Sequence, residues 1–395
     1  MEKKYLVEVP EEVGRRLEKS GSLSMHIENQ LLVIRPDDTR TLIPQLRFCS
    51  YGIGALVLAL AFLALMKIGY PHVRTLPWAG QTASISTVAT FLSIVSGVVA
   101  FTAAFCHQKI AKRGAASTFS WRSLFSLVVA CAMITALVGL AFGWLIAQLF
   151  PGLRLDLLTV TGLIFTAIAI TNYLLINLAW TLSPGVVSNL MTVMIVGGVG
   201  FSMLTNSRKD WWRYNFSFLG TNNNANAWQF NITLIFAGLL MGMLVDYLFV
   251  NLRPEHRSWK TQVLRGLLLF LAACIAAIGI FPNNPEYHLL HDRISMWLVY
   301  VLCLLIIIIR WCLPEVTKQF LKLSYLIGAV IVADYVLFKL VHYFSLTAFE
   351  LFSFILAAAW ILLLFQYIEN LLPTSPTTVP VRLVKVKKDQ ATDRG

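Results

Sequence analysis

Long apolar stretches alternate with short polar segments from about residue 47 to residue 372. Runs of roughly 18 or more apolar residues are typical of helices that span a membrane. The pattern predicts ten such spans, over about 47–69, 83–107, 123–148, 157–181, 185–205, 229–252, 263–282, 293–313, 320–344 and 347–372. Only Ser183-Pro184-Gly185 separates the fourth span from the fifth, and this triplet ends a helix well. The predicted fold class is an all-α polytopic membrane protein with about ten transmembrane helices.

Composition supports this class and excludes an ordinary soluble enzyme. Hydrophobic residues make up 57% of the chain and charged residues 13%, and the mean hydropathy is +0.70. A soluble domain is about one quarter charged. The charged N-terminal segment lacks the short apolar core of a cleavable signal peptide, so we expect the first span to act as the insertion signal.

The distribution of basic residues predicts the orientation. With ten spans both termini lie on one side, and most of the 32 Lys and Arg residues fall on that side. Because basic loops stay in the cytoplasm, we expect both termini to be cytoplasmic. The net charge of +12 then reflects this bias and the attraction of basic loops for anionic lipids, and it does not indicate nucleic-acid binding.

Residues 1–46 form a small soluble α+β segment in this prediction. Tyr5–Val9 is expected to be a strand, Glu11–Lys19 a helix after Pro10, and Ser22–Glu28 with Leu31–Ile34 a hairpin. This order resembles the AbrB-like swapped-hairpin domain, which implies an intertwined dimer and, in that family, frequent DNA binding. Acidic and basic residues balance here, so no basic face exists for phosphates.

A segment of this length cannot bury an adequate core alone. We therefore predict a cytoplasmic dimerisation domain at 1–46, with a monomeric β-rich cap as the alternative. The four spans of 47–181 are expected to form an N-terminal bundle, and 182–372 a six-span module. The tail, 373–395, is expected to be disordered and basic. Its alternating stretch from Val379 to Lys388 would otherwise add a strand to the N-terminal domain or lie on the inner leaflet.

Two polar motifs interrupt the six-span module, and the topology places both on the extracytoplasmic side. The first runs from Arg213 to Gly220 (RYNFSFLG) and is followed by Asn222–Asn224, and the second runs from Gly279 to Asn284 (GIFPNN) and is followed by His288, His291 and Asp292. Motifs in loops of one face can converge on a single pocket. We therefore expect a ligand site formed by Arg213, Tyr214, Asn215, Ser217, Asn283, Asn284 and His291.

These motifs also carry a family resemblance. Asn215–Gly220, Phe230-Asn231, Ala237–Leu240 and Gly279–Pro282 with a downstream histidine resemble the bacterial family known as domain of unknown function 998, distantly similar to Frag/DRAM/Sfk membrane proteins. The resemblance covers about 185–372. It implies a six-span bundle, a bacterial plasma-membrane location and a link to lipid or membrane homeostasis. Two histidines compete for the family's single position, and we favour His291 because it lies at the start of the next span.

A metal site is a weaker interpretation of the second motif. On a helix His288, His291 and Asp292 share a face, and two imidazoles with a carboxylate can bind Zn²⁺, with Glu286 as a possible fourth ligand. An interfacial hydrogen-bonding cluster is favoured over a metal, and no cofactor is expected. The six cysteines all fall within or beside spans, which favours packing roles over disulfides or zinc.

The loop that contains Arg213 and Tyr214 is rich in Arg and Trp. Aromatic residues at this depth are typical of the interfacial belt, whereas guanidinium groups beside them also suit phosphate head groups. Within the spans, Asp334 is the most costly residue, with Lys339, Asp246, Arg310, Glu350 and Glu369 among the others. We expect Asp334 to anchor a ligand below the outer motifs or to make a structural hydrogen bond.

Three functions stay open. The favoured one is a non-enzymatic membrane protein that binds a lipid or small amphipathic ligand, as a transporter or sensor, with membrane lipids and a second copy as partners. The alternatives are a membrane-embedded, metal-dependent or His291-dependent lipid hydrolase or transferase, and a dimeric scaffold. The sequence contains no recognisable nucleophile motif, which is why binding is favoured over catalysis.

Overall fold

The computed structural model describes residues 23–28, 31–36, 43–80, 84–111, 114–313, 316–372 and 379–381. Within them, ten helices are long and apolar enough to cross a membrane, in agreement with the ten predicted spans. They are α2 (Ile43–Gly69), α3 (Ile85–Ala111), α4 (Trp121–Leu149), α5 (Leu157–Trp180), α6 (Pro184–Thr205), α7 (Ala227–Val250), α8 (Trp259–Ile280), α9 (His288–Cys312), α10 (Lys318–Lys339) and α11 (Leu346–Asn370).

Capping residues explain where several of these helices begin. Ser183 is the N-cap of α6 with Pro184 in the first turn, so the Ser183-Pro184-Gly185 break between the fourth and fifth spans is confirmed. Ser258 and Thr261 form a reciprocal capping box at the start of α8. Helix α10 ends before the predicted limit of 344, and His342, in the segment that follows, has a φ of 53°. Such a conformation cannot continue a right-handed helix.

The chain divides into two compact units. One contains residues 1–49 and 373–395, and the other contains residues 50–372. In the first, strands β1 (Leu23–Glu28) and β2 (Leu31–Pro36) form an antiparallel hairpin, and β5 (Val379–Val381) pairs with β1. Three predicted features lie outside the described residues: the strand at Tyr5–Val9, the helix at Glu11–Lys19 and the tail beyond 381. The dimer of this segment stays a prediction.

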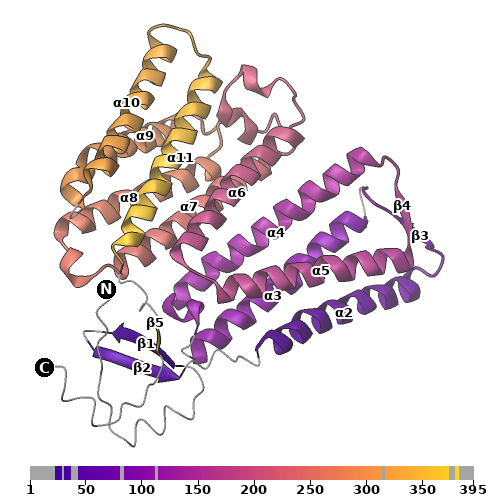
Figure 1. The fold of residues 1–395 in the computed structure, drawn as a ribbon. Helices are drawn as coiled ribbons and strands as arrows, with labels where there is room; N and C mark the ends of the chain where they lie inside the picture. The colour runs from indigo at the N-terminus through magenta and orange to yellow at the C-terminus, as the bar shows by residue number, and fades with distance from the viewer. Residues whose placement is uncertain are drawn as a thin grey trace, which may run out of the picture. The chain divides into compact units, whose positions relative to one another are not determined.

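The second unit is built from two groups of helices joined through α4. Helix α3 packs against α4 and α5, while α7 packs against α6 and α8, α8 against α9, and α10 against α11. Helix α4 contacts both α6 and α7 and so connects the groups. Figure 1 shows α2–α5 on one side of this unit and α6–α11 on the other. Strands β3 (Thr75–Pro77) and β4 (Arg154–Asp156) pair antiparallel, which places the α2–α3 and α4–α5 loops at the same end.

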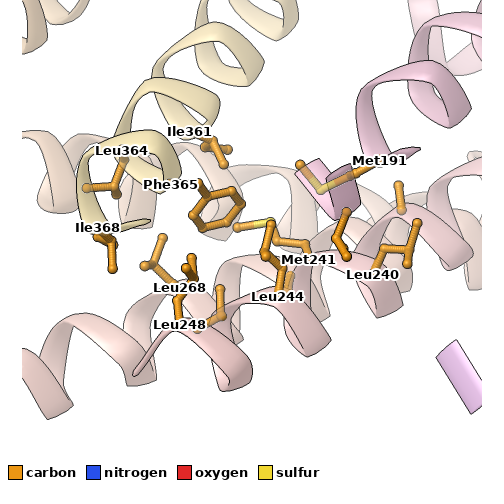
Figure 2. Packing of buried hydrophobic residues seen from close by; sticks show 14 of the residues in the cluster. Met191, Leu240, Met241, Leu244, Leu248, Leu268, Ile361, Leu364, Phe365 and Ile368 are labelled. Atoms are coloured by element: carbon orange, nitrogen blue, oxygen red, sulfur yellow. The ribbon is translucent and has the colours of Figure 1, made fainter. Parts of the chain in front are cut away.

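The six-helix group has a dense apolar core. Figure 2 shows side chains from α6, α7, α8 and α11 meeting there, among them Met191, Met241, Leu268 and Phe365. Close backbone approach between α7 and α8 is possible because Gly238 lacks a side chain: a Cβ at this position would lie 2.5 Å from the carbonyl oxygen of Ala272. Small residues that let backbones approach are typical of packed membrane helices. The five cysteines whose side chains the structure describes are free, and three of them, Cys131, Cys274 and Cys312, are buried.

Candidate functional site

The loops of the six-helix group meet at one end, which we call the loop face and define as residues 206–226, 281–287 and 340–345. The longest of them contains two short 3₁₀ helices, η2 (Trp211–Arg213) and η3 (Phe216–Gly220). Figure 1 shows the α6–α7 loop and the α10–α11 loop at the same end of the group. The two polar motifs of the sequence both belong to this face.

Buried asparagines hold the α6–α7 loop in shape. The amide nitrogen of Asn224 donates to the Leu219 carbonyl at 3.0 Å, and its amide oxygen accepts from the backbone N–H of Ser207 at 3.3 Å. Asn231 donates to the Gly220 carbonyl at 2.9 Å. A Cβ at Gly220 would lie 2.3 Å from the Asn231 amide oxygen, so a larger residue here would displace the Asn231 side chain. Backbone groups that leave a regular helix are thus satisfied by side chains, as a membrane-border loop requires.

His291 is the point at which the two motifs meet. It is 3% exposed, in the first turn of α9. Its Nδ1 lies 2.8 Å from the Phe281 carbonyl oxygen, and its Nε2 lies 3.2 Å from Ser217 Oγ. Asn284 adds a second link, since its side-chain oxygen accepts from the Asn222 backbone N–H at 2.9 Å. These contacts bring the two motifs together, whereas the ligand site expected there stays a prediction.

The partners of His291 define its tautomer when the imidazole is neutral. The Phe281 carbonyl has no proton to give, so Nδ1 must carry the hydrogen and donate it. Nε2 is then an acceptor, and the Ser217 hydroxyl donates to it. Ser217 is half-buried between the buried rings of Phe216 and Phe218. The geometry therefore presents a serine hydroxyl to the lone pair of an oriented histidine.

Glu350 completes the polar cluster from α11. Its half-buried carboxylate accepts a hydrogen bond of 2.5 Å from the backbone N–H of Phe216, directly beside Ser217. We call Ser217, His291 and Glu350 the polar cluster. The sequence indicated Glu350 only as a costly charged residue near the end of a span; its contact with the α6–α7 loop comes from tertiary structure.

In the second motif His288 and Asp292 are exposed, and Asn283 is half-buried. Asn283 Oδ1 lies 2.6 Å from Nδ1 of His288, and His288 Nε2 lies 3.5 Å from Asp292 Oδ2. Both side chains of that ion pair are about half exposed. His291 points elsewhere, with both ring nitrogens engaged. The structure thus does not bring His288, His291 and Asp292 to one point, and among the described residues no group of three His, Cys, Asp or Glu could hold a metal ion.

The aromatic and basic residues of the first motif form the rim of the loop face. Tyr214 is stacked on Phe218 with ring centroids 4.7 Å apart, and its hydroxyl accepts from Arg208 at 2.9 Å. The Arg213 guanidinium lies 5.2 Å from the Trp212 ring centroid. Both Arg213 and Tyr214 are exposed. These contacts fit the interfacial belt that the sequence offered as one interpretation.

Asn215 connects the rim to the interior. It is half-buried, and its amide oxygen has no hydrogen-bond partner among the described residues. A buried polar atom without a partner costs about 1–3 kcal/mol. Such an atom next to Phe216 and Ser217 is a position that a ligand or a water molecule would satisfy.

Asp334 lies below this face, within about two turns of the end of α10. It is 5% exposed; Ser353 of α11 donates to its Oδ2 at 2.7 Å, and its Oδ1 has no partner among the described residues. Ser353 follows Glu350 by three residues, so both side chains lie on the same face of α11. Asp334 is therefore bonded to α11 through Ser353, about one helical turn further into the helix bundle than Glu350.

An apolar cavity of about 90 Å³ lies within the six-helix group. Its lining comes from α6, α7, α8, α9 and α11, and three lining residues, Met191, Met241 and Ile361, appear in Figure 2. Phe354 lines the cavity and also contacts the Phe216 ring at a centroid distance of 5.4 Å. Phe216 precedes Ser217 in the chain. Phe354 thus lies between the cavity and the loop segment that carries Ser217.

Comparison with known families identifies this part of the chain. Residues 186–367 match the model of the family described as "Protein of unknown function (DUF998)". We call the six-helix group, which contains this match, the DUF998 module. The resemblance noted from the Asn215–Gly220 and Gly279–Pro282 motifs is thereby confirmed. No curated protein and no solved structure matches the chain. The polar cluster and the apolar cavity both lie inside the DUF998 module, whereas α2–α5 lie outside the match.

Proposed function

We propose that the DUF998 module binds an amphipathic lipid, with its polar head at the cluster of Ser217, His291 and Glu350 and part of its hydrocarbon chain in the apolar cavity. The observation that carries the proposal is a contact between two rings: Phe354 lines the cavity and touches Phe216, which precedes Ser217 in the chain. Ligand sites commonly combine an apolar pocket with a few convergent polar groups. A lipid has this same division into a polar and an apolar part.

The size of the cavity limits what it can hold. A cavity of 150 Å³ takes benzene, so 90 Å³ corresponds to roughly four carbon atoms. A ring system is too large, and a single segment of an acyl or isoprenoid chain fits. The rest of such a chain would lie along the lipid-exposed surfaces of α9 and α11. These surfaces face the hydrocarbon of the bilayer, so an acyl chain can lie on them without passing through water.

Charge at the cluster limits the head group. Glu350 places a carboxylate at the cluster, so a head group that brings a cation or hydrogen-bond donors is favoured there. Asn215 and Asp334 each offer an unpartnered oxygen, which also favours donors. A bare phosphate would be favoured only at the rim, near Arg213. A zwitterionic or hydroxyl-rich head group fits best.

The orientation of the protein belongs to this proposal. Because basic residues concentrate on the side of the termini, we place the loop face on the extracytoplasmic side of the bacterial plasma membrane. The site would then take lipid from the outer leaflet. This arrangement is that of a lipid sensor or transporter in membrane homeostasis.

The test is lipid retention, measured by native mass spectrometry after extraction from nanodiscs of phosphatidylethanolamine and phosphatidylglycerol. Ala357 lines the cavity, and Ala357→Leu should fill it. Ala359, on the same helix, is exposed and does not line it, so Ala359→Leu is the matched control. We expect wild type and A359L to retain a lipid and A357L to lose it. Equal retention in all three proteins would contradict the proposed site.

A further inference from the structure

Ser217 and His291 are arranged more specifically than the binding of a lipid head group requires. A head group can be held by any donor or acceptor, yet here one hydroxyl donates to the lone pair of Nε2 at 3.2 Å while Nδ1–H is held by the Phe281 carbonyl at 2.8 Å. A general base must lie within about 2.6–3.2 Å of the proton that it removes. An activated serine further requires that a third group orient the base. All three elements are present.

The parts of the pair come from different elements that are held rigidly. Ser217 lies in η3, which is fastened by Asn231 at the Gly220 carbonyl and by Glu350 at the Phe216 N–H. Phe281 follows the end of α8, where Gly279 is pressed against α7: a Cβ there would lie 2.4 Å from the Asn231 carbonyl oxygen. Preorganised groups avoid a reorganisation cost during reaction.

We infer that the DUF998 module is a lipid esterase in which Ser217 is the nucleophile and His291 the general base. The inference rests on the proposed function, because the amphipathic lipid bound there is the substrate. It must be a carboxylic ester whose carbonyl carbon reaches Ser217 Oγ. With a chain segment beside Phe354, the ester group would lie near Phe216, whose ring contacts Phe354.

The reaction balances with water as the only co-reactant. Ser217 Oγ forms a bond to the carbonyl carbon while its proton moves to His291 Nε2. The C–O bond to the alcohol then breaks, and the alcohol leaves with the proton from Nε2. Water next attacks the acyl-serine and passes its proton to Nε2. The Oγ–acyl bond breaks, the fatty acid leaves, and Ser217 regains its proton.

The orienting group sets this site apart from a triad with a carboxylate. The Phe281 carbonyl fixes the tautomer but carries no negative charge, so it stabilises the imidazolium less than an aspartate does. Slow turnover with an accumulating acyl-enzyme is the expected behaviour. This favours covalent labelling over steady-state assays as the first test.

The experiment uses an alkyl fluorophosphonate probe on the full-length protein in nanodiscs, with the adduct mapped by peptide mass spectrometry. The Ser217 oxygen displaces fluoride from phosphorus, so labelling reports nucleophilicity without knowledge of the substrate. We expect an adduct on Ser217 that is absent in Ser217→Ala and forms about 10²–10⁴-fold more slowly in His291→Ala. His288→Ala removes an exposed histidine of the same helix and should label like wild type.

Each outcome decides between the proposals. An adduct on Ser217 whose rate depends on His291 supports the esterase. A protein that retains lipid but gives no adduct on Ser217, or an adduct that persists unchanged in H291A, overturns it and leaves the binding proposal standing. Loss of lipid retention in A357L tests binding separately, since that substitution touches neither Ser217 nor His291. Labelling of a different serine alone would also overturn the assignment.

Discussion

Gly238→Ala offers the sharpest test of how the DUF998 module is packed. Gly238 is buried where α7 crosses α8. An added Cβ would lie 2.5 Å from the Ala272 carbonyl oxygen and 2.8 Å from both the Cβ and the backbone nitrogen of Ala276. These neighbours are backbone atoms or a fixed methyl group. They cannot turn away as the end of a flexible side chain would.

The magnitude follows from this geometry. Ordinary contact begins at 3.4 Å, so the helices must separate by about 0.9 Å, the difference from 2.5 Å. A gap of 0.5–1 Å forfeits about a quarter to a half of each dispersion contact along the interface. Overpacking of this kind costs about 1–3 kcal/mol, and more when backbone must move. The helix propensity of alanine returns up to about 1 kcal/mol. We expect a net loss of about 1–3 kcal/mol in the free energy of unfolding.

Gly242→Ala is the matched control one turn along the same helix. Its Cβ would lie 4.0 Å from the Ala272 Cβ, an ordinary contact, so this variant should be as stable as wild type or up to about 1 kcal/mol more stable. The assay is reversible unfolding in mixed micelles with increasing dodecyl sulfate, followed by far-ultraviolet circular dichroism. If G238A and G242A unfolded at the same detergent ratio, the close α7–α8 contact would be refuted.

Three further predictions concern polar contacts. Ser353→Ala removes the donor to the buried Asp334 carboxylate and should destabilise the protein by about 1–3 kcal/mol in the same assay, whereas Ser353→Thr keeps the hydroxyl; equal losses for both would argue against the bond. Glu350→Gln should weaken lipid retention in native mass spectra, because it removes the charge that favours donor-bearing head groups. Unchanged or stronger retention would contradict this role of the Glu350 carboxylate. Hydrogen bonds from the Thr159 side chain and from the backbone N–H groups of Thr159 and Leu158 lower the pKa of Asp156 in the folded protein. The Asp156 carboxylate therefore stabilises α5 above the pKa that Asp156 has in the unfolded chain, and this stabilisation is lost as the pH falls through its pKa in the folded protein. Asp156→Ala should therefore lower the melting temperature at neutral pH and leave it unchanged well below pH 3.8, and a loss of equal size at both pH values would contradict this assignment.

The positions of the spans followed from composition along the chain. A run of apolar side chains can lie in a bilayer only as a helix, since every backbone group must be satisfied within the segment. For this reason even the short break at Ser183-Pro184 could be placed from residue types, through the N-cap and the fixed φ of proline. The end of α10 could not, because the residues from Leu340 to Phe344 are apolar enough to continue a span.

Only part of the candidate site could be predicted from the sequence. Ser217 and His291 belong to motifs that alternating topology places on one face, so their proximity was expected. The pairing of Ser217 with Nε2, the role of the Phe281 carbonyl and the contribution of Glu350 were not. Arg213 and Tyr214 were predicted from the sequence as site residues together with Ser217 and His291, yet they lie at the exposed rim of the loop face.

What the sequence by itself determined was the membrane class, the ten helices and the face on which polar residues gather, because hydrophobicity and helix-ending residues act locally and need no knowledge of neighbours. What only the tertiary structure decided was which polar groups touch and which apolar side chains leave a cavity. Those contacts join residues far apart in the chain, such as Phe216 with Glu350, and they depend on helix rotation and on close approach at Gly238 and Gly279. A rotation of one residue, about 100°, would leave the pattern of hydropathy intact and turn every one of these side chains away.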